Sequence, residues 1–161
     1  MEVSIRRANA ADYQAVCELL AELDALHAEH LPDVFRKTEA PAREWDYYCG
    51  LLADENVALF VAEADGRVVG LAHVAIREAP AIPVFVPRRY AVVDAIGVRS
   101  GFRRRGIGRR LLDAVHAWAV EKGASSVELN VHEFNQEAIA FYRAVGYETL
   151  RRQMGKKLKQ D

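Results

Sequence analysis

The sequence predicts a mixed α/β domain with a central sheet of six to seven strands flanked by about four helices. Short runs rich in β-branched residues alternate with longer segments whose apolar residues recur at helical spacing. A tight turn joins two of the early strands, which favours antiparallel pairing, and a helix joins two of the later ones, which favours a parallel crossover. The 161 residues suit a single domain over residues 1–161, because a chain of this length buries about 68–70% of its unfolded surface.

The first half of the chain should form an antiparallel sheet and two helices. Pro32 ends the first helix, and Pro41 opens the second. Asp65 and Gly66 lie between two β-rich runs, which is a strong hairpin signal. The expected elements are a strand at 3–7, a helix from residue 9 or 10 to about 29, a helix from Pro41, and strands at 57–64 and 67–76.

The second half should add the parallel crossover. Three prolines make residues 79–87 a loop, Asn135 is suited to cap a helix, and Gly123 and Gly146 are suited to follow helix ends. The expected elements are a strand at 90–98, a helix at 106–122, a strand at 126–132, a helix from Asn135 to about 145, and one bent strand or two short ones within 148–158.

Composition excludes several classes of protein. The net charge of −1 gives no general attraction to nucleic acid or anionic membranes. No stretch approaches the ~20 apolar residues of a membrane span, and the first residues do not resemble a signal peptide. Cys17 and Cys49 have neither the spacing of a metal site nor that of a disulfide framework. We therefore expect a soluble cytoplasmic protein with no metal, no nucleic-acid partner and no membrane partner.

The most informative segment runs from Asp94 to Leu112, where a strand leads through a turn rich in Arg and Gly into a helix. The first N–H groups of a helix lack partners within the helix and carry partial positive charge. Gly106 and Gly108 place no side chain in front of those groups. The positive charge of the turn comes from Arg103, Arg104 and Arg105. This pattern predicts a ligand that carries phosphate.

Three motifs in order resemble the GNAT superfamily of N-acetyltransferases. The spacing Arg103-x-x-Gly106-x-Gly108 is similar to the family's pyrophosphate-binding signature. Residues 128–135, ELNVHEFN, resemble its next strand and loop, and residues 140–147, AFYRAVGY, resemble its final helix end. The resemblance is close over residues 90–147, whereas the first 55 residues match the family only in outline.

The resemblance implies direct transfer of an acetyl group from acetyl-CoA to a primary amine of a small molecule or a protein. Backbone groups of Ile96 and Val98 would line the acetyl-pantetheine arm, Asn135 would contact that arm, and Tyr142 would give a proton to the leaving thiolate. Many relatives pair through exposed strand edges, which favours a homodimer. The residues matched to the pyrophosphate loop are Arg103, Arg104, Arg105, Gly106, Ile107 and Gly108.

Asp94 is the candidate general base. An amine with a pKa near ~10 must lose a proton before it attacks a thioester, and a carboxylate is a suitable acceptor. Strict alternation along the strand would put Asp94 on the same face as Ile96 and Val98. A backbone N–H near Val98 would stabilise the oxyanion. The structural alternative for Asp94 is a salt bridge with Arg88 or Arg89.

The same residues also fit other interpretations. A Rossmann-type nucleotide site is suggested by Gly106-x-Gly108 with Glu128 about 20 residues on, but Leu111 stands where a third glycine is required. A second alternative is an acetyl-CoA sensor without transfer.

Arg104, Arg109 and Arg110 are either solvated or bind the 3′-phosphate of the cofactor. His27, Glu29, His30 and Asp33 suggest a substrate-lining loop more than a metal site, and His73 and His132 suggest half-buried polar residues.

Overall fold

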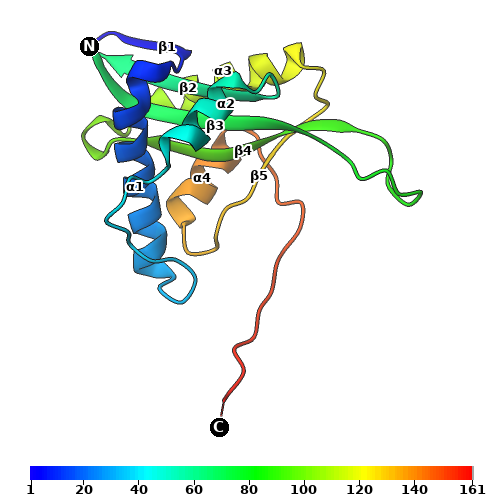
Figure 1. Cartoon of the computed structure of the whole chain (residues 1–161). Helices are drawn as coiled ribbons and strands as arrows, with labels where there is room; N and C mark the ends of the chain where they lie inside the picture. Colours follow the sequence, from blue (N-terminus) through cyan, green and yellow to red (C-terminus); the bar gives the residue numbers. More distant parts are fainter. Residues whose placement is uncertain (161) are drawn as a thin grey trace. The chain divides into compact units, whose positions relative to one another are not determined.

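The computed structural model describes residues 1–160 and confirms the mixed α/β fold (Figure 1). Its sheet has five strands in the order β1-β2-β3-β4-β5 within the described residues, so the prediction of six to seven strands is wrong. The strands are β1 (Val3–Arg7), β2 (Val57–Ala64), β3 (Arg67–Glu78), β4 (Arg89–Val98) and β5 (Val127–Leu129).

Strand pairing follows the predicted division of the sheet. The first four strands pair antiparallel, and β5 pairs parallel to β4. At the β2–β3 turn, Asp65 and Gly66 have φ angles of 51° and 76°, the left-handed conformation that a tight hairpin requires. β5 has three residues rather than the expected seven, since it pairs with β4 only opposite Ala91–Val93.

Helices cover both faces of the sheet. Leu59 and Val61 of β2 pack in one buried cluster with residues of α1 and α2. Ala62 points the opposite way, toward the face on which Leu111 of α3 packs. The helices in Met1–Asn130, one compact unit of the chain, are α1 (Tyr13–His30), α2 (Trp45–Ala53) and α3 (Ile107–Glu121), with short 3₁₀ turns at Ala10–Asp12 and Ser100–Phe102.

Two helix starts differ from the prediction. Asn9 and Asp12 form a capping box, which closes a 3₁₀ turn before α1 begins at Tyr13. The second helix begins at Trp45 rather than at Pro41, because the backbone of Glu44 is still extended (ψ 152°).

Residues 131–160 belong to a second compact unit of the chain. Its helix α4 (Gln136–Ala144) begins after Asn135, whose side-chain oxygen accepts a hydrogen bond from the Ala138 N–H at 3.2 Å, so the predicted cap is confirmed. Residues 148–158 form neither helix nor strand, and the prediction of strands there is wrong. In a strand, Leu150, Met154 and Leu158 would share one face with Arg152 and Lys156, so that face would be only partly apolar, and all five residues are exposed. The domain boundaries 1–161 stay a prediction.

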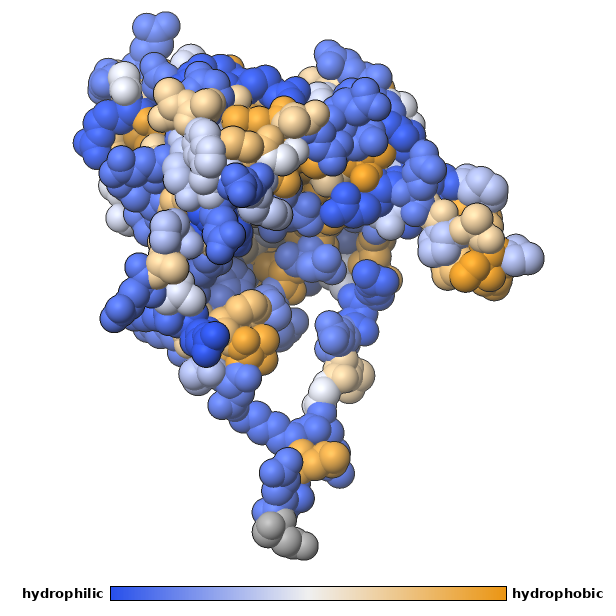
Figure 2. All heavy atoms as spheres, viewed as in Figure 1, coloured by the Kyte–Doolittle hydropathy of each residue, from blue (hydrophilic) through white to orange (hydrophobic). Residues whose placement is uncertain are grey.

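The loop between β3 and β4 carries an exposed apolar tip. Figure 2 shows hydrophobic side chains gathered at the end of this hairpin, which projects beyond the rest of the sheet (Figure 1). The exposed members are Ile82, Val84, Phe85 and Val86. Among residues 1–160, no helix combines the length and the apolar character needed to cross a membrane.

An ion-pair network ties β1 to the start of α1 and to β2. Arg6 donates two hydrogen bonds to Asp12, at 2.8 and 2.9 Å, and two to Glu63, at 2.8 and 3.0 Å. The Asp12 side chain is only 8% exposed. The Arg6 guanidinium holds the pKa of the Asp12 carboxyl below its usual range. This stabilisation is present above about pH 4, the unfolded value, and is lost as the pH falls through the lowered pKa.

Replacing Arg6 with Met should lower the free energy of unfolding by about 3 kcal/mol, because it leaves a buried carboxylate without its partner. Arg88→Met is the matched control, since Arg88 pairs with Glu128 at 2.6 Å but is 42% exposed. That change should cost less than about 1 kcal/mol. Urea unfolding of both variants measures the difference, and equal losses would contradict the importance assigned to Asp12 burial.

Candidate active site

The N-terminus of α3 has the form of an anion-binding site. Gly106 is its N-cap and adopts a left-handed conformation (φ 76°, ψ 6°), as a glycine does without strain. As a glycine, the N-cap has no side chain that could cap this helix end. The N–H groups of its first turn are therefore free to bind an anion, and the helix dipole adds partial positive charge.

The arginines of the turn differ in what they contact. Arg103 donates from Nε to the Val98 carbonyl oxygen at 3.0 Å, which ties the turn to the end of β4. The guanidinium of Arg105 lies 5.7 Å from the centre of the Phe102 ring. Arg110 donates to the Val3 carbonyl oxygen at 2.6 Å, so it has a structural partner as well as a place near the helix start. The turn is thus positively charged and held at a fixed position by β4.

Strand β4 has an open edge beside this helix start. β5 pairs only with Ala91–Val93, whereas β4 continues to Val98. Along residues 94–98, no strand within the described residues covers the edge that would face β5. Ile96 and Val98 lie in this stretch. Apart from the Val98 carbonyl oxygen, which accepts from Arg103, their backbone groups on this edge can hydrogen-bond an extended ligand, as a neighbouring strand would.

A β-bulge changes the face of the sheet on which the Asp94 side chain lies, compared with strict alternation along the strand. His73 of β3 pairs with Ala95 and Val74 pairs with Val93, so Asp94 is an extra residue in β4. Asp94 and Ala95 both line the same cavity. Strict alternation is therefore interrupted, and the prediction that Asp94 shares a face with Ile96 is wrong.

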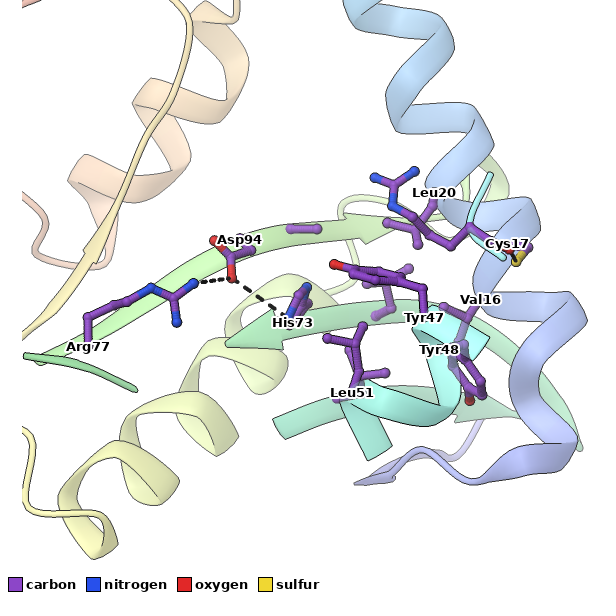
Figure 3. Close-up of a pocket in the computed structure, with 13 residues that line it drawn as sticks. Val16, Cys17, Leu20, Tyr47, Tyr48, Leu51, His73, Arg77 and Asp94 are labelled. Atoms are coloured by element: carbon purple, nitrogen blue, oxygen red, sulfur yellow. Dashed lines mark hydrogen bonds and ion pairs between the residues drawn. The ribbon is translucent and has the colours of Figure 1, made fainter. Parts of the chain in front are cut away.

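The cavity lies between α1, α2 and the sheet and encloses about 290 Å³ (Figure 3). Its apolar wall is formed by Val16, Leu20, Leu51, Leu59 and Leu71. Its polar lining includes Arg43, Tyr47, His73, Arg77 and Asp94. All of these residues belong to the first compact unit.

Asp94 has two basic neighbours, neither close enough to hydrogen-bond it. One carboxylate oxygen lies 3.7 Å from His73 Nε2 and 3.8 Å from an Arg77 guanidinium nitrogen (Figure 3). Burial lowers the pKa of His73, although the charge of Asp94 opposes this shift. His73 is therefore neutral at pH 7. The partners suggested by the sequence are wrong, since Arg88 pairs with Glu128 and Arg89 with Glu78.

Tyr142 lies at the end of α4 in the second unit. Its ring contacts Phe141 and Tyr147, with centroids 5.4 and 5.8 Å away. Burial raises the pKa of Tyr142 to about 12. The phenol is therefore protonated at neutral pH and can act as a proton donor.

The cavity is not lined by the polar residues at the end of α1, which are His27, Glu29, His30 and Asp33. His27 and His30 each donate from Nδ1 to the carbonyl oxygen four residues earlier, at 2.8 and 3.0 Å. Among residues 1–160, no group of three or more His, Cys, Asp or Glu side chains is arranged to hold a metal ion. The residues that sequence reasoning missed are instead His73, Arg77 and Arg43. His73 and Arg77 lie four residues apart on one strand, and this spacing alone does not indicate a functional site. The pairing register of β3 with β4 is what places them beside the bulge.

Known proteins resemble this chain over most of its length. A model of the Acetyltransferase (GNAT) family matches residues 20–147. An aminoglycoside N(6')-acetyltransferase type 1 from Salmonella enteritidis is 26% identical over 142 residues, which cover 83% of this chain and 93% of the relative.

Solved structures show the same fold. A mutant of the BH1408 protein from Bacillus halodurans has a TM-score of 0.92 at 24% identity, over 97% of this chain and 99% of that one. The aminoglycoside N-acetyltransferase AAC(6')-Iy in complex with CoA has a TM-score of 0.74 at 21% identity, over 98% of this chain and 100% of that one.

Proposed function

Because the chain belongs to the acetyltransferase (GNAT) family, we propose that it transfers the acetyl group of acetyl-CoA directly to a primary amine of a small molecule or a protein. The observation that carries this proposal is the uncapped N-terminus of α3, opened by Gly106 beside the free edge of β4. The two features together suit a ligand with a diphosphate at one end and an extended amide-bearing arm at the other.

The residues present fit acetyl-CoA. The N–H groups from Gly106 to Gly108 would hold the pyrophosphate, with Arg103, Arg104 and Arg105 supplying positive charge. Backbone groups of Ile96 and Val98 would pair with the pantetheine arm, and Asn135 would contact it. When bound, acetyl-CoA supplies an activated thioester. A role for Arg109 or Arg110 at the 3′-phosphate stays a prediction.

Asp94 is proposed as the general base. It lies at the bulge of β4, within the stretch whose edge is open and inside the cavity between α1 and α2. The substrate ammonium would give its proton to the carboxylate, and the free amine would then form the new N–C bond as the C–S bond breaks. The nitrogen would release its second proton to solvent to give the neutral amide. The N–H near Val98 would stabilise negative charge on the carbonyl oxygen.

Tyr142 is proposed as the acid that protonates the leaving thiolate. Replacing it with Phe should lower turnover about 10- to 100-fold, at or below the lower end of the effect usual for a general acid. Affinity for acetyl-CoA should remain nearly unchanged. Tyr147→Phe is the matched control, because the pKa of that phenol is also raised to about 12 by burial and its ring contacts Tyr142. Steady-state kinetics compare the two, and equal turnover in Tyr142→Phe and the wild type would remove the role.

The function is tested by calorimetry followed by a transfer assay. Acetyl-CoA should bind and NAD should not, which separates the proposal from the dinucleotide-binding alternative. Free CoA should then be released when amines of several classes are supplied, including aminoglycosides, amino acids, polyamines and peptides. Binding of acetyl-CoA without transfer to any of them would favour the sensor instead. The homodimer stays a prediction, and sedimentation of the purified protein would test it.

A further inference from the structure

We propose that the acceptor is an α-amino acid with an apolar side chain, whose ammonium group lies at Asp94 and whose carboxylate lies at Arg77 in the cavity of Figure 3. This inference rests on the proposed function and names its substrate class. The observations behind it are the charged side chains that line the cavity, the distance between Asp94 and Arg77, and the apolar walls.

The Asp94–Arg77 pair matches the two charges of an amino acid. The two side chains are 3.8 Å apart at their nearest atoms, which is close enough for attraction but too long for a hydrogen bond. The ammonium and carboxylate of an α-amino acid are separated by a single carbon, so both can be satisfied together. Each protein charge would then exchange a loose contact for a charge-assisted hydrogen bond.

The cavity lining is more basic than acidic. Arg43 and Arg77 are positive, Asp94 is the acidic member, and the buried His73 is neutral at pH 7. Arg43 donates to Asp24 through one guanidinium nitrogen, Nη1, which also donates to the Ala42 carbonyl oxygen. Its other two nitrogens have no partner among the described residues. A substrate with several ammonium groups would be repelled here, whereas one with a carboxylate would be attracted.

The walls define the rest of the substrate. Leu20 of α1 and Leu51 of α2 face the cavity, and Tyr47 adds an aromatic surface (Figure 3). Leu71 of β3 also lines it. An apolar side chain would bury its surface there at a gain of about 25 cal/mol per Å². The enclosed volume of about 290 Å³ lies at the lower end of small-molecule sites and suits a single amino acid.

The test compares matched substrates in the full-length protein. L-Leucine, L-methionine and L-phenylalanine are each assayed beside the corresponding amino acid amide, with kanamycin as a polycationic amine, and kcat/KM is measured by CoA release. Wild-type protein should prefer each amino acid to its amide, although the amide's amine loses its proton more readily. A preference for the amides, or transfer to kanamycin alone, would overturn the inference and leave the proposed function standing.

The Arg77→Gln variant separates recognition from catalysis. It should lower kcat/KM for the amino acids about 10- to 100-fold and change that for the amides little, because the lost contact is to the carboxylate. Arg67→Gln is the control, since Arg67 lies at the exposed start of the same strand outside the cavity. Equal losses for acids and amides would mean that Arg77 acts only through Asp94, which overturns the assignment. If none of the amines is acetylated while acetyl-CoA still binds, the proposed function itself is overturned.

Discussion

Replacing Gly106 with Val should raise the Kd for acetyl-CoA about 100-fold or more. A valine side chain would lie in front of the N–H groups of the first turn of α3, where the pyrophosphate is proposed to bind. Gly106 also has φ 76°, and a β-branched residue there is strained by about 1–2 kcal/mol. Calorimetric titration with acetyl-CoA measures the change in affinity.

Gly66→Val is the matched control for this substitution. Gly66 has the same φ of 76°, and a Cβ at either glycine would meet no atom within 4 Å. The two variants should therefore lose similar stability, but only Gly106→Val should lose affinity for acetyl-CoA. Equal affinity in both variants would show that the helix start does not hold the cofactor.

Replacing Asp94 with Asn should lower turnover about 100- to 10,000-fold, because an amide cannot accept the proton of the substrate amine. Affinity for acetyl-CoA should remain close to that of the wild type, since the pyrophosphate is held at a different part of the site. The measurement is kcat over a range of pH, in which the residual activity should rise as the solvent supplies more free amine.

Asp113→Asn serves as the control, because Asp113 is an exposed carboxylate on α3 outside the cavity. It should leave turnover and the pH–rate profile unchanged. If Asp94 were only the partner of His73 and Arg77, its replacement would alter stability and leave the shape of the pH–rate profile as in the wild type. That outcome would remove Asp94 as the base.

The predictions that succeeded rest on local chemistry. Asp65-Gly66 specifies a hairpin turn by itself, and Asn135 caps a helix through its own side chain. Gly106 was expected at the start of α3 because the Gly-rich turn comes directly before an amphipathic pattern, and it has the left-handed conformation that suits glycine. Each of these features depends on residues within a few positions of one another.

The predictions that failed depend on pairing between distant segments. The bulge that turns Asp94 into the cavity arises from the register of β4 on β3, which alternation within β4 cannot reveal. The same register brings His73 and Arg77 to Asp94. Residues 148–158 contain enough apolar residues to suggest strands, yet a strand also needs a partner edge, and no sequence pattern specifies that edge.

The central claim is that the anion-binding site at Gly106 and the carboxylate of Asp94 serve one transfer reaction. The most direct test supplies isotope-labelled acetyl-CoA and an amine to the wild-type protein and follows both products by mass spectrometry. We predict that the label appears on the amine nitrogen in equal amount to the free CoA released, and that Asp94→Asn slows both together. Release of CoA without labelled amine, or labelled amine formed equally fast by Asp94→Asn, would contradict the claim.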